Sequence, residues 1–337
     1  MASDQSNESA LALWYVGAGR AEIRRERLAA PRPGEIQVQA LYGAISRGTE
    51  RLVAAGRVPE SEFERMRAPF MGGAFPFPVK YGYSIVGRIE SGPPELQDRL
   101  VFSLHPHQSV FIVPVEAAIP LPADLPPARA VLAANMETAL NAMWDASPGP
   151  ADTITVVGAG VVGALVAFLC GQLPGAQVTL VDVDRSRAGL AHALGIAFAT
   201  PGAAPGDCDL VVHASGAASG LTTALGLAGQ EATVLDLSWY GAGEVAIPLG
   251  GAFHSRRLKL VASQVGQVAP SHRPRWTHQR RLAAALDLLA DSRLDALIAP
   301  PIAFADLPAL LPKILEPESG PLCQLVTYPA AGASVRT

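Results

Sequence analysis

Three glycines and one carboxylate carry the clearest chemical signal in the sequence. Gly158, Gly160 and Gly163 have the spacing Gly-x-Gly-x-x-Gly, directly after the apolar residues 153–157, and Asp182 ends a second apolar segment further on. The first glycine permits a tight turn, the second lets a backbone approach a diphosphate, and the third lets a helix pack closely on a strand. This glycine motif predicts a βαβ unit that binds a dinucleotide on free amides at the N-terminus of a helix.

Asp182 distinguishes between the two nicotinamide cofactors. Its carboxylate would accept a hydrogen bond from a ribose hydroxyl and would repel the 2′-phosphate of NADP. We therefore expect NAD, with NADP less favoured, although Arg185 and Arg187 just beyond could offset part of the repulsion. Val162, in the first turn of the expected helix, and Arg187 are included among the expected cofactor contacts.

The chain after residue 149 alternates between strand and helix patterns. Helical spacing of apolar residues is found at residues 279–289, and segments typical of strands are at residues 153–157, 177–181, 209–213, 232–237 and 258–263. This order predicts a parallel, doubly wound sheet, and so an α/β fold.

Ligands contact such a sheet where its strands end. Two short segments there, residues 213–216 and 237–239, are candidate contacts for the ribose and the nicotinamide. The residues assigned to this role are Ser215, Gly216, Leu237 and Ser238. Turn formation alone is the alternative explanation for both segments.

The chain before residue 149 has the pattern of strands and turns. Short segments bounded by Pro or Gly predict a β-rich, barrel-like domain over residues 1–148; they are at residues 36–40, 83–89, 100–102 and 110–113. A proline-rich linker at residues 120–127 leads to an expected helix at residues 128–144. A last strand at residues 323–327 is expected to return, with residues 295–337, to this first domain, which leaves residues 149–294 as the dinucleotide-binding domain.

The composition excludes several classes of function. The 337 residues have a formal net charge of −4 and only 17% charged residues, so the chain has no overall attraction to nucleic acid or to a membrane. Residues 1–9 lack the basic-then-apolar order of a signal peptide and are interpreted as a frayed terminus. Cys170, Cys208 and Cys323 are too far apart for a cysteine-rich metal site or a disulfide framework, and a cytoplasmic location is expected.

The order of motifs along the chain resembles the medium-chain dehydrogenase/reductase superfamily, which includes zinc-dependent alcohol and polyol dehydrogenases. The motifs that carry the resemblance, besides the glycine motif, are residues 33–38, 43–49, 77–83, 98–101 and 120–122. Residues 45–50 are similar to the branch that contains a dehydrogenase of bacteriochlorophyll synthesis. The resemblance implies a GroES-like domain, a Rossmann domain, a homodimer, and NAD-dependent interconversion of an alcohol and a ketone or aldehyde.

The resemblance also implies where a catalytic zinc would be held, and this sequence departs from that pattern. Zinc members have a cysteine where this chain has Ser46 and a histidine where it has Tyr83, and their third ligand falls at Glu137. Serine and tyrosine hydroxyls are poor zinc ligands. No cysteine precedes Cys170, so the cysteines of the family's structural zinc site are missing too, and we expect no zinc.

Without zinc, another group must stabilise charge on the reacting oxygen. By resemblance, Ser46, Tyr83 and Glu137 converge where the metal would lie, and a tyrosine hydroxyl can donate a hydrogen bond or a proton. The ordinary tyrosine pKa of about 10 would need lowering, for instance by Lys80 if that side chain points inward. The structural alternatives are that Tyr83 only packs in its strand and that Glu137 caps a helix or pairs with an arginine.

Four more residues complete the candidate set. Thr49 and Glu50 form a plausible hydroxyl–carboxylate proton relay by resemblance, and Arg47 would contact the cofactor diphosphate unless it only forms a salt bridge. His107 lies on a turn near the expected cleft, where a surface histidine is the simpler interpretation.

Residues 253–281 hold seven Lys and Arg residues, three histidines and no acid. A solvated face or a subunit contact is the simpler interpretation of this basic segment. Recruitment of an anionic small-molecule substrate is the functional one, and nucleic acid comes third because the net charge is negative.

The sequence thus favours an oxidoreductase acting on an alcohol and ketone pair without zinc. Reduction of an activated carbon–carbon double bond, as in quinone reductases, is a second hypothesis for the same fold. A catalytically silent NAD(H)-binding sensor or scaffold is the alternative from another class.

Overall fold

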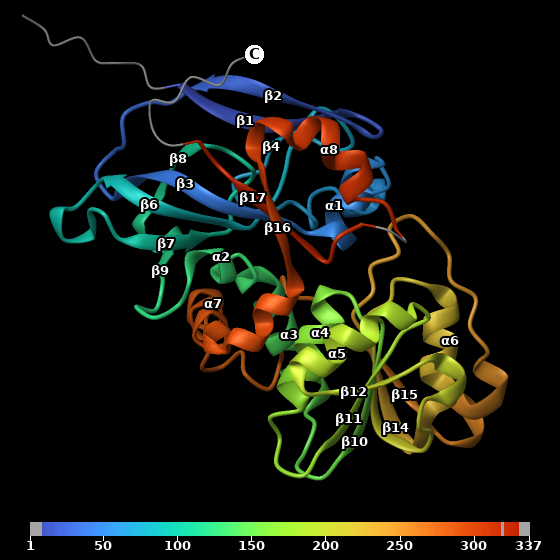
Figure 1. The fold of residues 1–337 in the computed structure, drawn as a ribbon. Helices are drawn as coiled ribbons and strands as arrows, with labels where there is room; N and C mark the ends of the chain where they lie inside the picture. Colours follow the sequence, from blue (N-terminus) through green and yellow to red (C-terminus); the bar gives the residue numbers. More distant parts are fainter. Residues whose placement is uncertain (1–8, 318–319, 330–337) are drawn as a thin grey trace, which may run out of the picture. The chain divides into compact units, whose positions relative to one another are not determined.

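The computed structural model describes residues 9–317 and 320–329, which form two compact units (Figure 1). The first unit takes in the described residues up to Ala134 and from Ile298 onward, and the second unit is residues 135–297. Whether these units coincide with the functional domains expected from the sequence stays a prediction. The expected frayed terminus lies outside the described residues except for Ser9, which begins a strand. No helix within the described ranges combines the length and apolar character needed to cross a bilayer.

A parallel sheet of six strands forms the centre of the second unit. The strands lie in the order β12-β11-β10-β13-β14-β15, in which the chain runs outward in both directions from β10 and β13. This is the 3-2-1-4-5-6 order of dinucleotide-binding sheets, and it confirms the predicted doubly wound α/β fold. The strands are β10 (Thr153–Val157), β11 (Gln177–Val181), β12 (Ala197–Ala199), β13 (Cys208–His213), β14 (Ala228–Asp236) and β15 (Lys259–Ala262).

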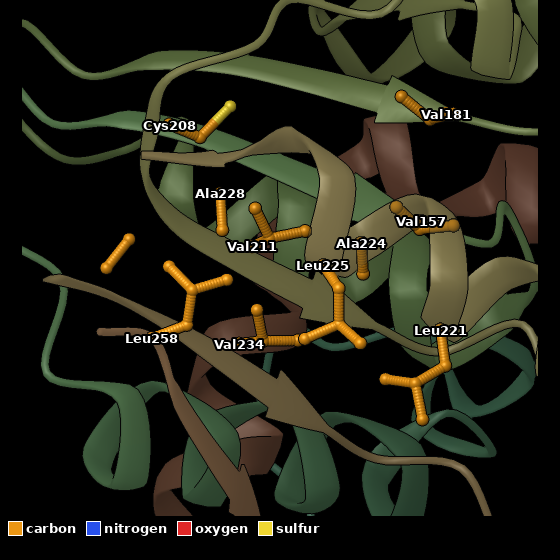
Figure 2. Close-up of a cluster of buried hydrophobic side chains, with 11 residues drawn as sticks. Val157, Val181, Cys208, Val211, Leu221, Ala224, Leu225, Ala228, Val234 and Leu258 are labelled. Atoms are coloured by element: carbon orange, nitrogen blue, oxygen red, sulfur yellow. The ribbon is translucent and has the colours of Figure 1, made fainter. Parts of the chain in front are cut away.

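Apolar side chains on strands and helices hold this sheet together. On α6, Leu221, Ala224 and Leu225 follow helical spacing and pack on Val211 and Val234 of neighbouring strands, as Figure 2 shows. Burying each leucine stabilises the fold by about 1.5–3 kcal/mol. The helices of this unit are α3 (Ala133–Ala146), which begins at the division, α4 (Val161–Cys170), α5 (Ala188–Leu194), α6 (Ala218–Leu227) and α7 (His278–Asp287).

The first unit is β-rich, as predicted, and consists of two sheets. The larger sheet has the order β16-β17-β3-β6-β7-β9, with β8 also paired to β3, and the smaller has the order β2-β1-β5-β4. The strands are β1 (Ser9–Gly17), β2 (Arg20–Arg27), β3 (Glu35–Ile45), β4 (Gly72–Gly73), β5 (Val79–Lys80), β6 (Ile85–Ser91), β7 (Leu100–Ser103), β8 (Val110–Pro114), β9 (Ala118–Pro120), β16 (Ile298–Ala303) and β17 (Cys323–Thr327). Its helices are α1 (Arg47–Ala54), α2 (Pro127–Ala130) and α8 (Leu307–Ile314). The last strand therefore returns to the first unit, because β17 pairs with β3.

One expectation about the elements was wrong, and one hairpin was missed. The single helix expected at residues 128–144 is two helices, α2 and α3, and the apolar spacing concealed the break because Val131 and Leu132 between them are buried too. The hairpin of β1 and β2 was not predicted. Strand β2 pairs only with β1 and has no fully buried residue, so its sequence lacks the apolar alternation that reveals a strand.

Candidate functional site

The three glycines of the motif lie where the central strand of the parallel sheet meets α4. Gly158 has a φ of 111°, and a Cβ on it would lie 2.6 Å from the Ser215 nitrogen. A Cβ on Gly163 would lie 2.0 Å from the Gly158 carbonyl oxygen. Gly160 differs from both, because a Cβ there would meet no atom within 4 Å. Two glycines are thus required by the fold itself, and the third leaves open space at the helix N-terminus.

This open space faces the first turn of α4. Gly160 is the N-cap residue, and its carbonyl accepts the first helical hydrogen bond from Ala164. The amides of the first turn, including that of Val162, have no acceptor within their own helix. The place is suited to a diphosphate, as the sequence predicted.

Asp182 bridges the end of β11 to the glycine turn. One carboxylate oxygen accepts a hydrogen bond from the Ala159 amide at 2.7 Å, and the other accepts one from the Asp184 amide at 2.9 Å. A carboxylate can accept about four hydrogen bonds, so Asp182 retains capacity for a ribose hydroxyl. Arg187 pairs with Asp184 at 3.2 Å.

A second polar network lies at the ends of the neighbouring strands β13 and β14. His213 and Asp236 are register partners at these ends, and His213 Nδ1 lies 2.9 Å from Asp236 Oδ1. Burial alone raises the pKa of Asp236, but hydrogen bonds from His213 and the Ser238 amide outweigh it and lower that pKa. The ionised carboxylate fixes the proton on Nδ1, so Nε2 accepts a hydrogen bond from the Ser215 hydroxyl at 2.7 Å.

The predicted strand-end contacts all belong to this network. The Gly216 amide donates to Ser238 Oγ at 3.0 Å, and the Leu237 amide donates to the His213 carbonyl at 2.9 Å. The structure therefore brings Ser215, Gly216, Leu237 and Ser238 together at one edge of the sheet, beside the glycine turn that contacts Ser215.

The Ser215–His213–Asp236 arrangement has the distances of a hydrolytic triad, but its burial assigns it another task. The His213 side chain has no exposed surface, so the imidazole cannot pass a proton to a leaving group, which a triad requires. The Ala217 amide also donates to the serine oxygen at 3.2 Å. The network instead holds the exposed Ser215 hydroxyl in one orientation.

In the first unit, Ser46 and Tyr83 contact each other directly. Ser46 follows β3 and is the N-cap residue of α1, while Tyr83 lies two residues before β6, and the two strands pair at Gly43 and Ile85. The Tyr83 hydroxyl donates a hydrogen bond to Ser46 Oγ. Burial raises the pKa of Tyr83 to about 12, although hydrogen bonds with Ser46 and Thr49 partly offset the effect. Tyr83 is therefore a protonated donor at neutral pH.

Lys80 does not lower the pKa of Tyr83. The Lys80 ammonium lies 2.7 Å from the carboxylate of Glu26 in β2 and 2.9 Å from the Gln108 amide oxygen. Its charge is neutralised there, and the pKa of Tyr83 is raised rather than lowered.

Glu50 is the centre of a buried network below Ser46. It accepts hydrogen bonds from the Ser46 amide at 2.7 Å and from the Tyr15 hydroxyl at 2.6 Å, and it lies 3.0 Å from His107 Nε2. His107 Nδ1 is in turn 3.3 Å from the Tyr328 hydroxyl. Burial, followed by the charge of Glu50, raises the pKa of both tyrosines. The network connects the helix cap at Ser46 to the interior of the first unit.

The interpretation of His107 as a surface histidine was wrong. Its exposed fraction is 0%. The reason is the unpredicted strand β1, because the Leu13 amide donates to the His107 carbonyl and Ala12 bridges to Gln108. The hairpin covers a turn that the sequence placed at the surface.

Arg47 binds the backbone of the C-terminal segment. Its guanidinium donates to the carbonyls of Gly320 and Pro321 at 2.9 and 2.8 Å and to that of Pro317 at 3.1 Å. Arg47 therefore fastens the start of α1 to the chain beyond α8. Its expected contact with a cofactor diphosphate stays a prediction.

Glu137 forms a buried ion pair within the second unit. Its carboxylate lies 3.0 Å from Arg281 Nε, and Arg281 also donates to the Asn141 side chain at 2.6 Å and to the carbonyl of Gln267. Burial raises the pKa of Glu137, with Arg281 partly offsetting the effect. The Arg281 side chain is 1% exposed, so this residue is not part of the solvated face expected at residues 253–281.

Of the three family positions for zinc, only Glu137 carries a side chain that is a good zinc ligand, and the absence of zinc stays a prediction. Among the described residues, no group of three or more His, Cys, Asp or Glu side chains is placed to hold a metal ion. Of the three positions that hold zinc in the family, Ser46 and Tyr83 offer hydroxyls bonded to each other, and Glu137 is engaged by Arg281.

Sequence reasoning missed several partners in these networks. Asp236 and His213 gave a usable signal, because both are polar residues at the ends of otherwise apolar strands. Tyr15 and Tyr328 gave none, since aromatic residues in strands are ordinary core residues.

Comparison with known proteins supports the fold. No family model matches the chain, and no curated protein matches it. Among solved structures, a putative zinc-binding dehydrogenase from Sinorhizobium meliloti 1021 bound to NADP is 19% identical, with a TM-score of 0.75 over 95% of this chain and 99% of that one. L-idonate 5-dehydrogenase from Escherichia coli K-12 is 14% identical, with a TM-score of 0.77 over 95% and 98%. An alcohol dehydrogenase from E. coli CFT073 complexed with NADH is 15% identical, with a TM-score of 0.74 over 95% and 100%. The chain therefore has, over nearly its whole length, the fold of the medium-chain alcohol and polyol dehydrogenases.

Proposed function

We propose that the chain is a nicotinamide-dependent oxidoreductase that interconverts an alcohol and a ketone or aldehyde without zinc. The observation that carries the proposal is the open space at Gly160, with Asp182 beside it, at the point where the order of a parallel sheet reverses. Ligands of doubly wound sheets bind at this point. The fold shared with alcohol and polyol dehydrogenases supports the same class of reaction.

We propose NAD(H) as the preferred cofactor, with NADP(H) second. One protein of similar fold holds NADP and another holds NADH, so the preference rests on Asp182 alone. Its carboxylate keeps acceptor capacity for ribose hydroxyls and repels a 2′-phosphate. Arg187 supports NADP less than the sequence suggested, because its guanidinium pairs with Asp184.

Hydride transfer is chemistry that a bound nicotinamide supplies. The chain contributes the binding surface at the glycine motif, the oriented Ser215 hydroxyl, and a hydrogen-bond donor for the reacting oxygen. We assign the last role to Tyr83, whose hydroxyl would exchange its bond to Ser46 for one to the substrate oxygen. The hydrogen bond with Thr49 would then hold the phenol in place.

Zinc independence is supported by the ion pair of Glu137 and Arg281. A metal at this position would have to displace a buried guanidinium that also donates to Asn141 and to backbone carbonyls. Removing one partner of a buried ion pair costs about 3–5 kcal/mol. We therefore propose that purified protein contains much less than one zinc per chain.

Reduction of an activated carbon–carbon double bond is the second candidate, and the pKa of Tyr83 favours it. A phenol whose pKa is about 12 is a weak proton donor, and an enone needs less stabilisation of charge on its oxygen than a saturated ketone does. A panel of saturated ketones, aldehydes and enones, tested with NADH, distinguishes the two reactions. Tight NADH binding without turnover on any of them would point to the silent sensor. The homodimer and the cytoplasmic location remain predictions.

Titration of NADH and NADPH against the protein tests the cofactor assignment. NADH should bind more tightly, and Asp182→Asn should narrow the difference while keeping an oxygen that accepts the Ala159 amide. The lost charge-assisted hydrogen bond is worth about 1.5–3 kcal/mol. Equal affinities in the wild type would contradict the role of Asp182.

A further inference from the structure

A pocket in the second unit combines aromatic rings with cationic side chains. Its volume is about 310 Å³, and it is lined by Ser271, His272, Arg275, Trp276 and Arg280. These residues lie just before α7 and in its first turn. None of them belongs to the glycine motif or to the His213 network, so the pocket is separate from the residues assigned to the proposed reaction.

The aromatic part of the pocket is held rigidly by stacking. The rings of Trp144 and His272 are 4.1 Å apart and nearly parallel, at 5°. Trp276 lies 4.8 Å from Trp144, and the Arg280 guanidinium lies 4.0 Å above the Trp276 ring. An arginine stacked on a ring keeps its N–H donors in the plane of the guanidinium. The stacked side chains that line the pocket are therefore preorganised, and the N–H groups of Arg280 can donate hydrogen bonds to a ligand in the pocket.

The two guanidinium groups lack a carboxylate partner. Arg280 donates to the Arg275 carbonyl at 2.8 Å, and neither side chain forms an ion pair within the described ranges. Elsewhere in this unit exposed arginines do pair, for example Arg257 with Glu231 and Arg293 with Asp291. Two unneutralised cations beside one pocket repel each other, and an anion bound between them would offset that repulsion.

We propose that this pocket binds a small organic anion in which a carboxylate or a phosphate adjoins a flat ring. The anionic group would accept hydrogen bonds from Arg275 and Arg280, whose planar donors match both anions. The ring would contact the His272 and Trp276 side chains. Ser271 adds a hydroxyl 2.9 Å from His272 Nδ1, which fixes the imidazole in the wall.

Indole resonances in a ¹H–¹⁵N NMR spectrum test the proposal on the intact protein. The chain has four tryptophans, and each is assigned by its Trp→Phe variant. Phenyl phosphate and benzoate serve as probes, and inorganic phosphate shows how much the ring contributes. The signals of Trp276 and Trp144 should shift as the probe concentration rises and should reach a plateau, while those of Trp14 and Trp239 should not shift. The stronger of the two aromatic probes identifies the anionic group.

Charge variants separate the pocket from a merely basic surface. Arg275→Gln and Arg280→Gln should each weaken binding of the stronger probe about tenfold or more, since each removes a charge-assisted hydrogen bond. Arg257→Gln removes the same charge at an exposed ion pair outside the pocket lining and should leave the affinity unchanged.

Two results would overturn the proposal. One is the absence of any saturable shift at Trp276 with either aromatic probe at millimolar concentration. The other is an equal loss of probe affinity in the Arg257→Gln control and in the two pocket variants, together with binding of a single-stranded oligonucleotide that is tighter than binding of the probe. This second result would indicate a basic surface without a defined pocket. Neither result bears on NADH binding, which the glycine motif accounts for independently.

Discussion

Replacing Tyr83 by phenylalanine removes one hydroxyl and little else. The ring stays in place, including its edge contact with Tyr81 at 6.0 Å, and the hydrogen bonds with Ser46 and Thr49 are lost. We expect a stability loss of about 1–3 kcal/mol, because each hydrogen bond contributes about 0.5–1.5 kcal/mol. NADH affinity should not change. Turnover should fall by about 100-fold, which corresponds to roughly 2.7 kcal/mol on the barrier and is the lower range for a positioned proton donor.

The assay is NADH consumption with the best substrate from the carbonyl and enone panel, with unfolding in urea measured in parallel. Tyr81→Phe is the matched control, since it removes a hydroxyl from the neighbouring ring and should retain turnover. Because the pKa of Tyr83 is about 12, its hydroxyl keeps its proton throughout the neutral range. The wild-type turnover rate should therefore not fall near pH 10 through ionisation of Tyr83, a fall that would be missing in Tyr83→Phe. Near-normal turnover of Tyr83→Phe, or such a decline, would refute the assignment.

Three further predictions follow from the structure. Gly163→Ala should destabilise the fold strongly, because the new Cβ would lie 2.0 Å from a carbonyl oxygen. Gly160→Ala should fold normally and weaken NADH binding. Equal stability of the two variants, measured by thermal unfolding, would contradict the geometry of the glycine motif. Arg281→Leu should cost about 3–5 kcal/mol in urea unfolding because it leaves Glu137 buried without its partner, while the exposed Arg257→Gln should cost no more than about 0.5 kcal/mol. Five tyrosines have a raised pKa in the folded protein, so the stability that they contribute is complete below about pH 10 and is lost as the pH rises through those raised pKa values. Absorbance at alkaline pH should show that these tyrosines ionise together with unfolding. Reversible ionisation of all five in the folded protein at pH 10 would refute this prediction.

The second unit was the more predictable part of the fold. Its central strands β10 and β13 are almost wholly buried. Apolar segments such as residues 153–157 and 177–181 therefore correspond to β10 and β11 with the same end residues. The glycine motif was predictable for a related reason, since close approach of backbone atoms at Gly158 and Gly163 admits no other residue.

The catalytic candidates were predictable as a set but not in their contacts. Ser46, Thr49, Glu50 and Tyr83 came from the family pattern, and the structure places them together. The burial of His107 depends on β1, a strand distant in the sequence whose pairing no local pattern announces. Pairing of Glu137 with an arginine was one of the predicted alternatives, and the structure confirms it. Which arginine was hidden, because Arg281 lies in a basic segment whose other arginines are mostly exposed. Long-range polar pairing is set by tertiary structure, and sequence periodicity does not report it.

Turnover measured before and after chelation, with zinc determined in the same sample, tests the central proposal most directly. The proposal predicts that the protein oxidises NADH with a carbonyl or enone substrate, contains far less than one zinc per chain, and keeps its activity in chelator. Loss of activity on chelation, restored by added zinc in a one-to-one ratio, would contradict it.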